Sequence, residues 1–259
     1  MAPPKTYRCE AVILSYAPLG EADLLVTMFT KDQGKVRAVG KGARRSTSKL
    51  VGHLEPLTTV KMSMANGRNM DIISQVEVIN SFSTLKGDLT GITKGQYLAE
   101  IVDGFGAEAS PNPSLFQLMI NTLQVIEAAP ESEMALRYFE YHLLQVSGLM
   151  PELYHCVECR DELEPNAHRF SPNVGGTLCL ECCPDDAHLR PLSLRALKVL
   201  RLLDRSQLAE ACKLTIDDNL SAELRSLLFT TVTYWLGKEI RSNSFLERLH
   251  NETVTEVYI

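Results

Sequence analysis

Four cysteines in two pairs carry the clearest chemistry in this sequence. Cys156 and Cys159 form one Cys-x-x-Cys pair and Cys179 and Cys182 form the other, with nineteen residues between the pairs. Two such pairs supply the four soft ligands that a tetrahedral zinc ion prefers, and the spacing is typical of zinc ribbons. The loop between them is rich in Asn, Gly and Pro, which allow the chain to reverse. The sequence therefore predicts one structural zinc ion.

Other uses of these cysteines agree less well with the sequence. A redox Cys-x-x-Cys occurs once, beside a βαβ pattern that is missing here. A zinc deaminase needs His-x-Glu followed by Pro-Cys-x-x-Cys, and neither Cys156 nor Cys179 follows a proline. If one ligand is assigned wrongly, three neighbours remain as substitutes: His155, Cys183 and His188.

The residues around the cysteines are acidic. Residues 152–190 hold three Lys or Arg against eight Asp or Glu, and four thiolates around a zinc ion add further negative charge. Such a module would repel phosphates. We expect it to brace the fold or to contact a protein, and we do not expect it to contact DNA.

Positive charge is concentrated near the N-terminus. Residues 1–80 hold eleven Lys or Arg against seven Asp or Glu, whereas the remaining residues hold fifteen against twenty-five. The stretch GKGARRSTSK mixes cations with small hydroxyl residues, which are groups that bind phosphate oxygens. The alternative is a solvated, flexible loop. The residues predicted to contact DNA phosphates are Lys35, Arg37, Lys41, Arg44, Arg45 and Lys49. Aromatic residues are few near this loop, so we expect binding to be mostly electrostatic and independent of sequence.

The elements that position these residues change in type along the chain. Residues 7–80 contain five segments with strand character, and Asn66 and Gly67 mark a hairpin between the last two. Five short strands in this length predict a small closed barrel of the OB-fold type. From residue 84 onward the apolar residues recur with helical spacing. The predicted helices are 89–105, 115–129 capped by Ser114, 134–146, 194–205 capped by Ser193, and 222–240 with Trp235 in the core.

The predicted fold class is therefore α+β with several domains. We expect an OB-fold DNA-binding domain over residues 1–82 and a helical domain over residues 83–151 and 191–259. The four-cysteine zinc module, residues 152–190, is inserted in the helical domain. One predicted helix carries a cationic stripe, which is either a solvated face or a second phosphate track. The stripe consists of Arg195, Lys198, Arg201 and Arg205.

Several function classes are excluded by what the sequence lacks. It has no phosphate-binding G-x-x-x-x-G-K-[ST] motif, and its one G-x-G-x-x-A match, at residues 104–109, ends a helical pattern instead of following a strand. No nucleophile with a partner base is evident, so we predict that the protein is not an enzyme. No apolar run approaches the roughly 18 residues of a membrane helix. Without a signal peptide and with seven cysteines, an odd number, the chain is predicted to be cytoplasmic and free of a disulfide framework.

Over nearly its whole length the sequence resembles the RecO family of bacterial recombination-mediator proteins. The most specific match is Phe170-Ser-Pro-x-x-Gly175-Gly176-x-x-Cys179-x-x-Cys182. One departure is Arg160, where a glycine usually follows the second cysteine. Further matches are Ala11 to Leu14, Gly20, Glu21 and Asp23, Phe29, Thr30 and Gly34, Lys41 to Ser46, Leu98 to Glu100, Gly148 and Pro151, and Gly237 to Leu246.

The resemblance implies a non-catalytic mediator of DNA repair. Similar proteins bind single- and double-stranded DNA, anneal complementary strands and, with RecR, help load RecA onto strands covered by single-stranded DNA-binding protein. It implies association with the nucleoid. The alternative hypothesis is a zinc-ribbon factor of transcription or translation whose barrel binds RNA or protein.

Overall fold

The structure is a computed structural model that describes residues 6–50, 52–182 and 186–249. The chain folds into two compact units. Met1–Pro130 and Ile240–Ile259 form the first, and Glu131–Glu239 form the second. In the described part of the chain, no helix is long and apolar enough to cross a membrane.

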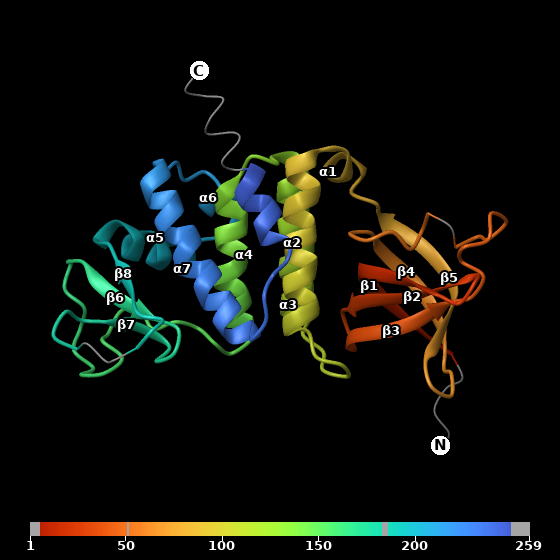
Figure 1. Cartoon of the computed structure of the whole chain (residues 1–259), viewed down its shortest axis with the longest axis horizontal. Coiled ribbons are helices and arrows are strands. Elements are labelled where there is room, and N and C mark those ends of the chain that lie inside the picture. The colour runs from red at the N-terminus through yellow and green to blue at the C-terminus, as the bar shows by residue number, and fades with distance from the viewer. Residues whose placement is uncertain (1–5, 51, 183–185, 250–259) are drawn as a thin grey trace. The chain divides into compact units, whose positions relative to one another are not determined.

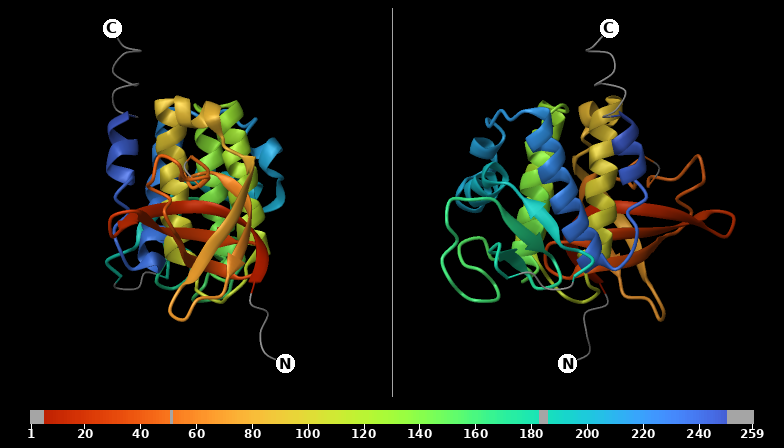
Figure 2. Two further views of the ribbon diagram at one scale, coloured as in Figure 1. Left: turned by 90° about the vertical axis from the view of Figure 1, so that its right-hand side faces the viewer. Right: turned by 60° about the vertical axis from the view of Figure 1, so that its left-hand side comes forward.

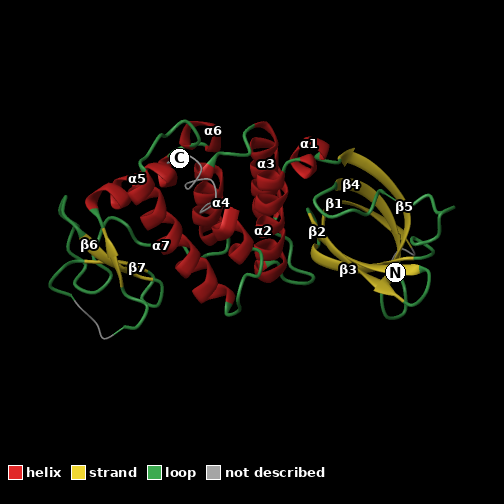
Figure 3. Cartoon of the chain, turned by 45° about the horizontal axis from the view of Figure 1, so that its top comes forward, coloured by secondary structure: helices red, strands yellow, loops and turns green. Residues whose placement is uncertain are grey.

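The first unit begins with a closed five-stranded barrel, as predicted (Figures 1 and 3). The strand order is β1-β2-β3-β5-β4, and the ring closes through β1 and β4. All neighbours are antiparallel except β3 and β5, which pair in parallel. This is the arrangement of an OB-fold. The strands are β1 (Thr6–Leu19), β2 (Asp23–Thr30), β3 (Gly34–Gly40), β4 (Thr59–Ala65) and β5 (Asp71–Asn80).

Alternating side chains fill the barrel. Cys9, Ala11 and Ile13 of β1 face inward and are buried, and Val26 and Met28 of β2 join them. Because successive strand residues point to opposite faces, every second residue can enter the core. Residues of the long connection between β3 and β4 also belong to this core, so the connection is folded onto the barrel.

Three helices follow the barrel in the first unit, and residues 243–249 are helical as well. The three are α1 (Ser83–Gly87), α2 (Leu89–Phe105) and α3 (Pro113–Ala128). Helix α2 has the predicted bounds and is capped by Asp88, whose side chain accepts from Gly91 N. The cap predicted for α3 was wrong. Asn112 caps this helix by accepting from Leu115 N, and Ser114 lies inside the first turn, since Pro113 occupies the first helical position.

The second unit contains α4 (Glu133–Val146), α5 (Leu194–Arg205), α6 (Leu208–Ala211) and α7 (Asp218–Leu236) around one apolar core. Ser193 caps α5 as predicted, accepting from Ala196 N. The predicted bounds of the last helix were wrong. Asp217 caps α7, which begins at Asp218, four residues before the predicted start, and Gly237 ends it with a φ of 66°. Trp235 was also wrongly placed in the core, because 41% of its surface is exposed near this end.

The four-cysteine module of the second unit carries a small antiparallel sheet. Its order is β7-β6-β8, with β6 (His168–Ser171) in the centre. Strand β7 (Gly176–Leu178) runs directly into the second cysteine pair, and β8 (Arg190–Leu192) leads to α5. The sheet therefore holds the second pair close to the helical part of the same unit.

Candidate metal centre and nucleic-acid interface

The structure brings the four predicted cysteines into one cluster. The Sγ atoms of Cys156, Cys159, Cys179 and Cys182 all lie within 4.8 Å of one another. Tetrahedral ligands at the Zn–S distance of about 2.3 Å are about 3.8 Å apart. The Sγ atoms of Cys159 and Cys179 are 3.9 Å apart. The residues present therefore match the size and the donor set of a closed zinc site.

Backbone amides around Cys156 favour a thiolate. Burial raises the pKa of this thiol, but hydrogen bonds from the amides of Cys179, Cys159 and Glu158 outweigh it and lower the pKa to about 6. The Cys179 amide donates to Cys156 Sγ at 3.4 Å. In Cys182 a hydrogen bond with the Cys179 side chain, together with burial, raises the pKa. Four thiols this close cannot all lose their protons unless a cation compensates the charge.

The residue after the first pair adopts a glycine-like backbone. Arg160 has a φ of 69°, in the left-handed region, and its amide donates to Cys156 O at 3.0 Å. This conformation is unfavourable for a residue with a Cβ atom. A glycine would adopt this conformation without that cost, and the same turn forms here with arginine at position 160.

Two glycines let the polypeptide close up behind the second pair. Gly175 has a φ of 81°. A Cβ on Gly176 would lie 2.6 Å from Glu152 O, because the two segments exchange hydrogen bonds there. The Gly175-Gly176 motif thus positions the strand that leads to Cys179.

The side chains considered as substitute ligands have other neighbours or are outside the structure. His155 lies 3.8 Å from the Glu152 carboxylate, and the His188 ring contacts Tyr234. Cys183 lies outside the described residues. In the described part of the chain, the four cysteines are the one His, Cys, Asp or Glu group placed to hold a metal ion.

The predicted basic residues fall into two sets in the structure. One set is bound to the protein itself. Lys35 Nζ donates to Asp103 O at 2.6 Å and lies 3.4 Å from the carboxylate of Asp103, with 14% of its side chain exposed. Arg37 lies 3.7 Å from the carboxylate of Glu108 and remains half-exposed. These contacts leave Lys35 little freedom to bind another anion.

Arg44 also has a structural contact. Its guanidinium donates to Gly20 O and Glu21 O, both at 3.1 Å, at the tip of the β1–β2 hairpin. Its backbone amide donates to Ala22 O, and the amide of Gly42 donates to the Asp23 carboxylate at 2.7 Å. The basic loop, which we define as residues 41–49, is therefore fastened to the hairpin. Its backbone forms successive turns, and most of its side chains are exposed.

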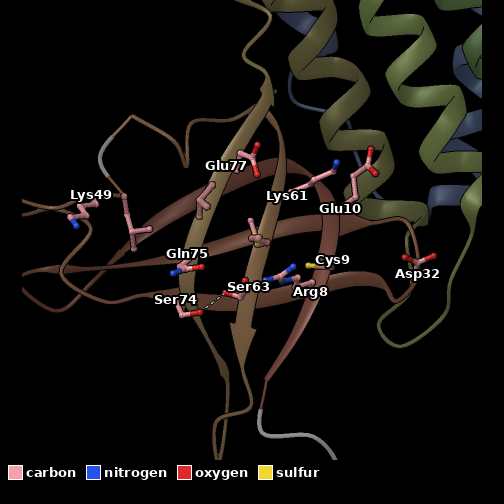
Figure 4. Close-up of a pocket in the computed structure, with 13 residues that line it drawn as sticks. Arg8, Cys9, Glu10, Asp32, Lys49, Lys61, Ser63, Ser74, Gln75 and Glu77 are labelled. Carbon is pink, nitrogen blue, oxygen red and sulfur yellow. Dashed lines mark hydrogen bonds between the residues drawn. The ribbon is translucent and has the colours of Figure 1, made fainter.

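The second set is exposed, as Arg37 and Arg44 also are, but its side chains form no hydrogen bond or ion pair with the described residues. Lys41, Arg45 and Lys49 extend from the basic loop to the surface. Lys49 lines a groove of about 610 Å³ along β1, β4 and β5 (Figure 4). The same groove contains two cations outside the basic loop, Arg8 and Lys61, which the sequence analysis did not single out. Pairing of β1 with β4 places them on one wall of the groove, so no local sequence signal marks them.

The groove is not uniformly positive. Lys61 pairs with Glu10 on one neighbouring strand and with Glu77 on the other. Arg8 pairs with Ser63, which in turn pairs with Gln75, so this second row is cationic and polar. Flanking carboxylates weaken the attraction of Lys61 for phosphates. The cations of the basic loop lack such flanking acids in their own segment.

The cationic stripe on α5 is largely engaged within the second unit. Arg195 lies 2.6 Å from the Asp217 carboxylate, and Arg205 donates to Arg201 O at 3.0 Å. Arg201 donates to Leu153 O at 2.9 Å and stacks on the Tyr154 ring. Lys198 is exposed. Arg201 therefore fastens α5 to the segment before the first cysteine pair, and Arg195 fastens it to the N-cap of α7.

Comparison with known proteins matches both parts of the chain. Residues 1–82 match the family model described as Recombination protein O N terminal, and residues 86–244 match Recombination protein O C terminal. The chain is 37% identical over 243 residues to the DNA repair protein RecO of Roseiflexus sp. (strain RS-1), covering 94% of this chain and 86% of the relative. It is 34% identical over 250 residues to the DNA repair protein RecO of Desulforamulus reducens, covering 96% and 97%.

Proposed function

Because this chain belongs to the RecO family, we propose that it is a non-catalytic mediator of DNA repair that binds single- and double-stranded DNA and anneals complementary strands. The relatives named above are DNA repair proteins, which favours this function over a factor of transcription or translation. The residues that support this proposal best lie in the basic loop. It holds Lys41, Arg45 and Lys49 exposed on a barrel, in a chain with a net charge of −6.

The proposed activity requires phosphate binding and no covalent step. Exposed Lys and Arg side chains neutralise phosphates and release counterions, which gives binding that does not depend on sequence. Annealing is favourable once two complementary strands are held near each other, so the protein needs no catalytic group for it. RecR, single-stranded DNA-binding protein and the RecA pathway are the proposed partners, and the nucleoid is the proposed location.

We further propose that the four cysteines hold one structural zinc ion. Four thiolates form a closed site without an open position for a substrate, which is typical of structural zinc. The ion would supply positive charge that compensates the thiolates and would hold the two pairs together. The acidic surroundings favour a bracing role.

A salt titration of DNA affinity tests the DNA-binding proposal. The double variant Lys41→Ala/Arg45→Ala should weaken binding to all sequences alike and reduce the slope of log K against log salt by about one to two units, since each lost phosphate contact contributes 0.7 to 0.9. Lys213→Ala, which removes an exposed cation from the second unit outside both candidate phosphate sites, is the matched control and should leave the slope unchanged. Parent-like binding and annealing by the double variant would move the DNA site elsewhere.

Metal analysis tests the zinc proposal. The purified protein should contain about one zinc ion per chain. Cys179→Ser should release the ion and lower stability, because metal-binding energy is folding energy in such modules. Cys212→Ser, a partly buried cysteine away from the cluster, should keep the full zinc content. Undiminished zinc in the Cys179→Ser protein would reject the ligand assignment.

A further inference from the structure

An exposed tyrosine lies on the hairpin to which the basic loop is fastened. Beyond Val12, where the pairing of β1 with β4 ends, β1 and β2 continue as an arm that reaches the β1–β2 turn, visible as the protruding red hairpin in Figure 2. Tyr16 lies on this arm with 48% of its surface exposed. In the described part of the chain no group hydrogen-bonds to its hydroxyl. A large aromatic side chain that is exposed and has no polar partner is available to bind a ligand.

Strand register places Tyr16 on the same side of the sheet as the basic loop. Tyr16 is opposite Val26, and Val26 is opposite Ala38 on β3. Directly opposed residues point to the same face, and Val26 and Ala38 belong to the barrel core. Ala43 and Leu54, from the connection between β3 and β4, pack into that same core. Tyr16 therefore lies at the rim of the barrel on the side where this connection folds over it.

The spacing brings Tyr16 within reach of the loop cations. The adjacent row of the sheet runs from Pro18 through Leu24 to Gly40, and Lys41 follows Gly40 directly. Strands lie about 4.8 Å apart, so the β1 and β3 positions of one row are separated by about 10 Å. Fastening of the basic loop by Arg44 keeps this spacing fixed.

We propose that Tyr16 stacks on a base of a nucleic-acid strand whose phosphates are bound by the cations of the basic loop. The inference rests on the proposed function and adds a base contact to it. Single strands expose base faces, whereas a duplex conceals them by pairing and stacking. Tyr16 thus gives the site a preference for single-stranded nucleic acid that phosphate contacts alone do not provide.

Charge favours nucleic acid over a protein as the occupant of this surface. The arm and the basic loop together hold two acids, Glu21 and Asp23, against four cations. The Asp23 carboxylate is occupied by the Gly42 amide. An exposed aromatic ring close to exposed cations is the arrangement of surfaces that bind single strands.

Fluorescence anisotropy with three labelled probes tests the inference: oligo-dT, a duplex of equal length and an abasic strand. Tyr16→Ala should weaken oligo-dT binding by roughly 5- to 150-fold, the range expected for one base stack. Its duplex and abasic-strand affinities and its salt slope should stay near those of the parent. Tyr16→Phe should retain most of the affinity. Leu19→Ala, which changes the opposite face of the same arm, is the control and should bind like the parent.

A tryptophan at position 16 provides a second readout that does not depend on the alanine variant folding. In Tyr16→Trp/Trp235→Phe the new indole is the single tryptophan of the chain, and oligo-dT should quench its fluorescence. Parent-like oligo-dT binding by Tyr16→Ala, or no quenching of the indole, overturns the stacking. If Tyr16→Ala binds like the parent but Lys41→Ala/Arg45→Ala loses affinity, the DNA-binding proposal stands and the stacking proposal is wrong. If neither variant loses affinity, both proposals are wrong.

Discussion

At Arg160 the backbone has a φ of 69° beside the first cysteine pair. The left-handed conformation costs a residue with a Cβ about 1 to 2 kcal/mol, and glycine avoids most of this cost. Arg160→Gly should therefore stabilise the cysteine module by about 1 kcal/mol, although glycine also gains freedom in the unfolded chain. Chemical unfolding of the zinc-loaded protein, followed together with metal release, measures the change.

Arg160→Ala separates the backbone effect from the loss of the side chain. Alanine keeps the Cβ and hence the strain, so this variant should be no more stable than the parent. Equal stabilisation by both substitutions would show that the arginine side chain, and not its φ, is unfavourable there.

The neighbours Arg44 and Arg45 should behave differently although their types are identical. Arg44 donates two hydrogen bonds to the hairpin tip, so Arg44→Ala should lower the free energy of unfolding of the barrel by about 1 kcal/mol. Arg45 is exposed, so Arg45→Ala should leave stability unchanged and reduce the salt slope by about one unit. Thermal unfolding and DNA titration of both variants measure the two effects. A pure loss of affinity in Arg44→Ala would contradict its structural role.

Among the elements, the β2–β3 turn depends on one glycine. Thr30 Oγ1 donates to Gly34 O at 2.9 Å and accepts from the Gln33 amide, which closes the turn. Gly34 has a φ of 71°, and a Cβ there would lie 2.6 Å from Ala107 O. The Lys35 amide donates to the same carbonyl, so the segment after α2 lies against the edge of β3. Gly34 is therefore needed both for the turn and for the close packing of β3 against the segment after α2.

Gly34→Ala should destabilise the barrel by about 2 kcal/mol or more, because backbone atoms must move to admit the methyl group. Gly20→Ala is the matched control. Gly20 has a φ of 61° but has no atom within 4 Å of a built Cβ, so its substitution introduces the same backbone strain without the overlap. The difference between their unfolding free energies isolates the overlap. Equal unfolding free energies of the two variants would show that the segment after α2 moves aside without a measurable loss of stability.

At the scale of the whole molecule, the chain leaves the first unit at Pro130 and returns to it at Ile240. Glu100 on α2 receives the returning segment. Its carboxylate accepts from the amides of Arg241 and Ser242, both at 2.9 Å, and from Ser242 Oγ at 2.7 Å. Residues 243–249 are helical, so Glu100 satisfies free amides at the start of this helix. The contact therefore joins two segments that lie far apart in sequence: Glu100 on α2, and Arg241 with Ser242.

Glu100→Ala should release the returning segment. Three hydrogen bonds to a carboxylate are lost, so protease cleavage between residues 237 and 249 should accelerate several-fold. Limited proteolysis with mass spectrometry measures the rate. Glu100→Gln keeps acceptor capacity at its amide oxygen and should be protected to an intermediate degree. A cleavage rate in Glu100→Ala equal to that of the parent would mean that other contacts hold the segment.

Residue types and their spacing were enough to predict the local features of this protein. The spacing of the four cysteines predicted their cluster, strand-forming segments predicted the barrel, and helical periodicity predicted α2 and α4. These features depend on neighbours within a few turns or strands, so residue type and spacing suffice. Two helix starts were predicted wrongly: Asn112 caps α3 in place of Ser114, and α7 begins at Asp218 instead of residue 222, because several residues near each start can cap a helix. The predicted domain boundaries, the zinc ion and the DNA-contacting residues stay predictions.

Contacts between distant segments determine which basic side chains are free and which are bound within the protein. Residue type and local charge do not distinguish Lys35 and Arg44 from Lys41 and Arg45. In the structure, however, Lys35 and Arg44 donate hydrogen bonds to backbone carbonyls that are distant in sequence. Likewise, Tyr16 is brought to the side of the basic loop by pairing of β1 with β2 and of β2 with β3. Trp235 is exposed because α7 ends at Gly237 and carries its last turn beyond the core. In each case a long-range contact decides the outcome, and no local pattern specifies such a contact.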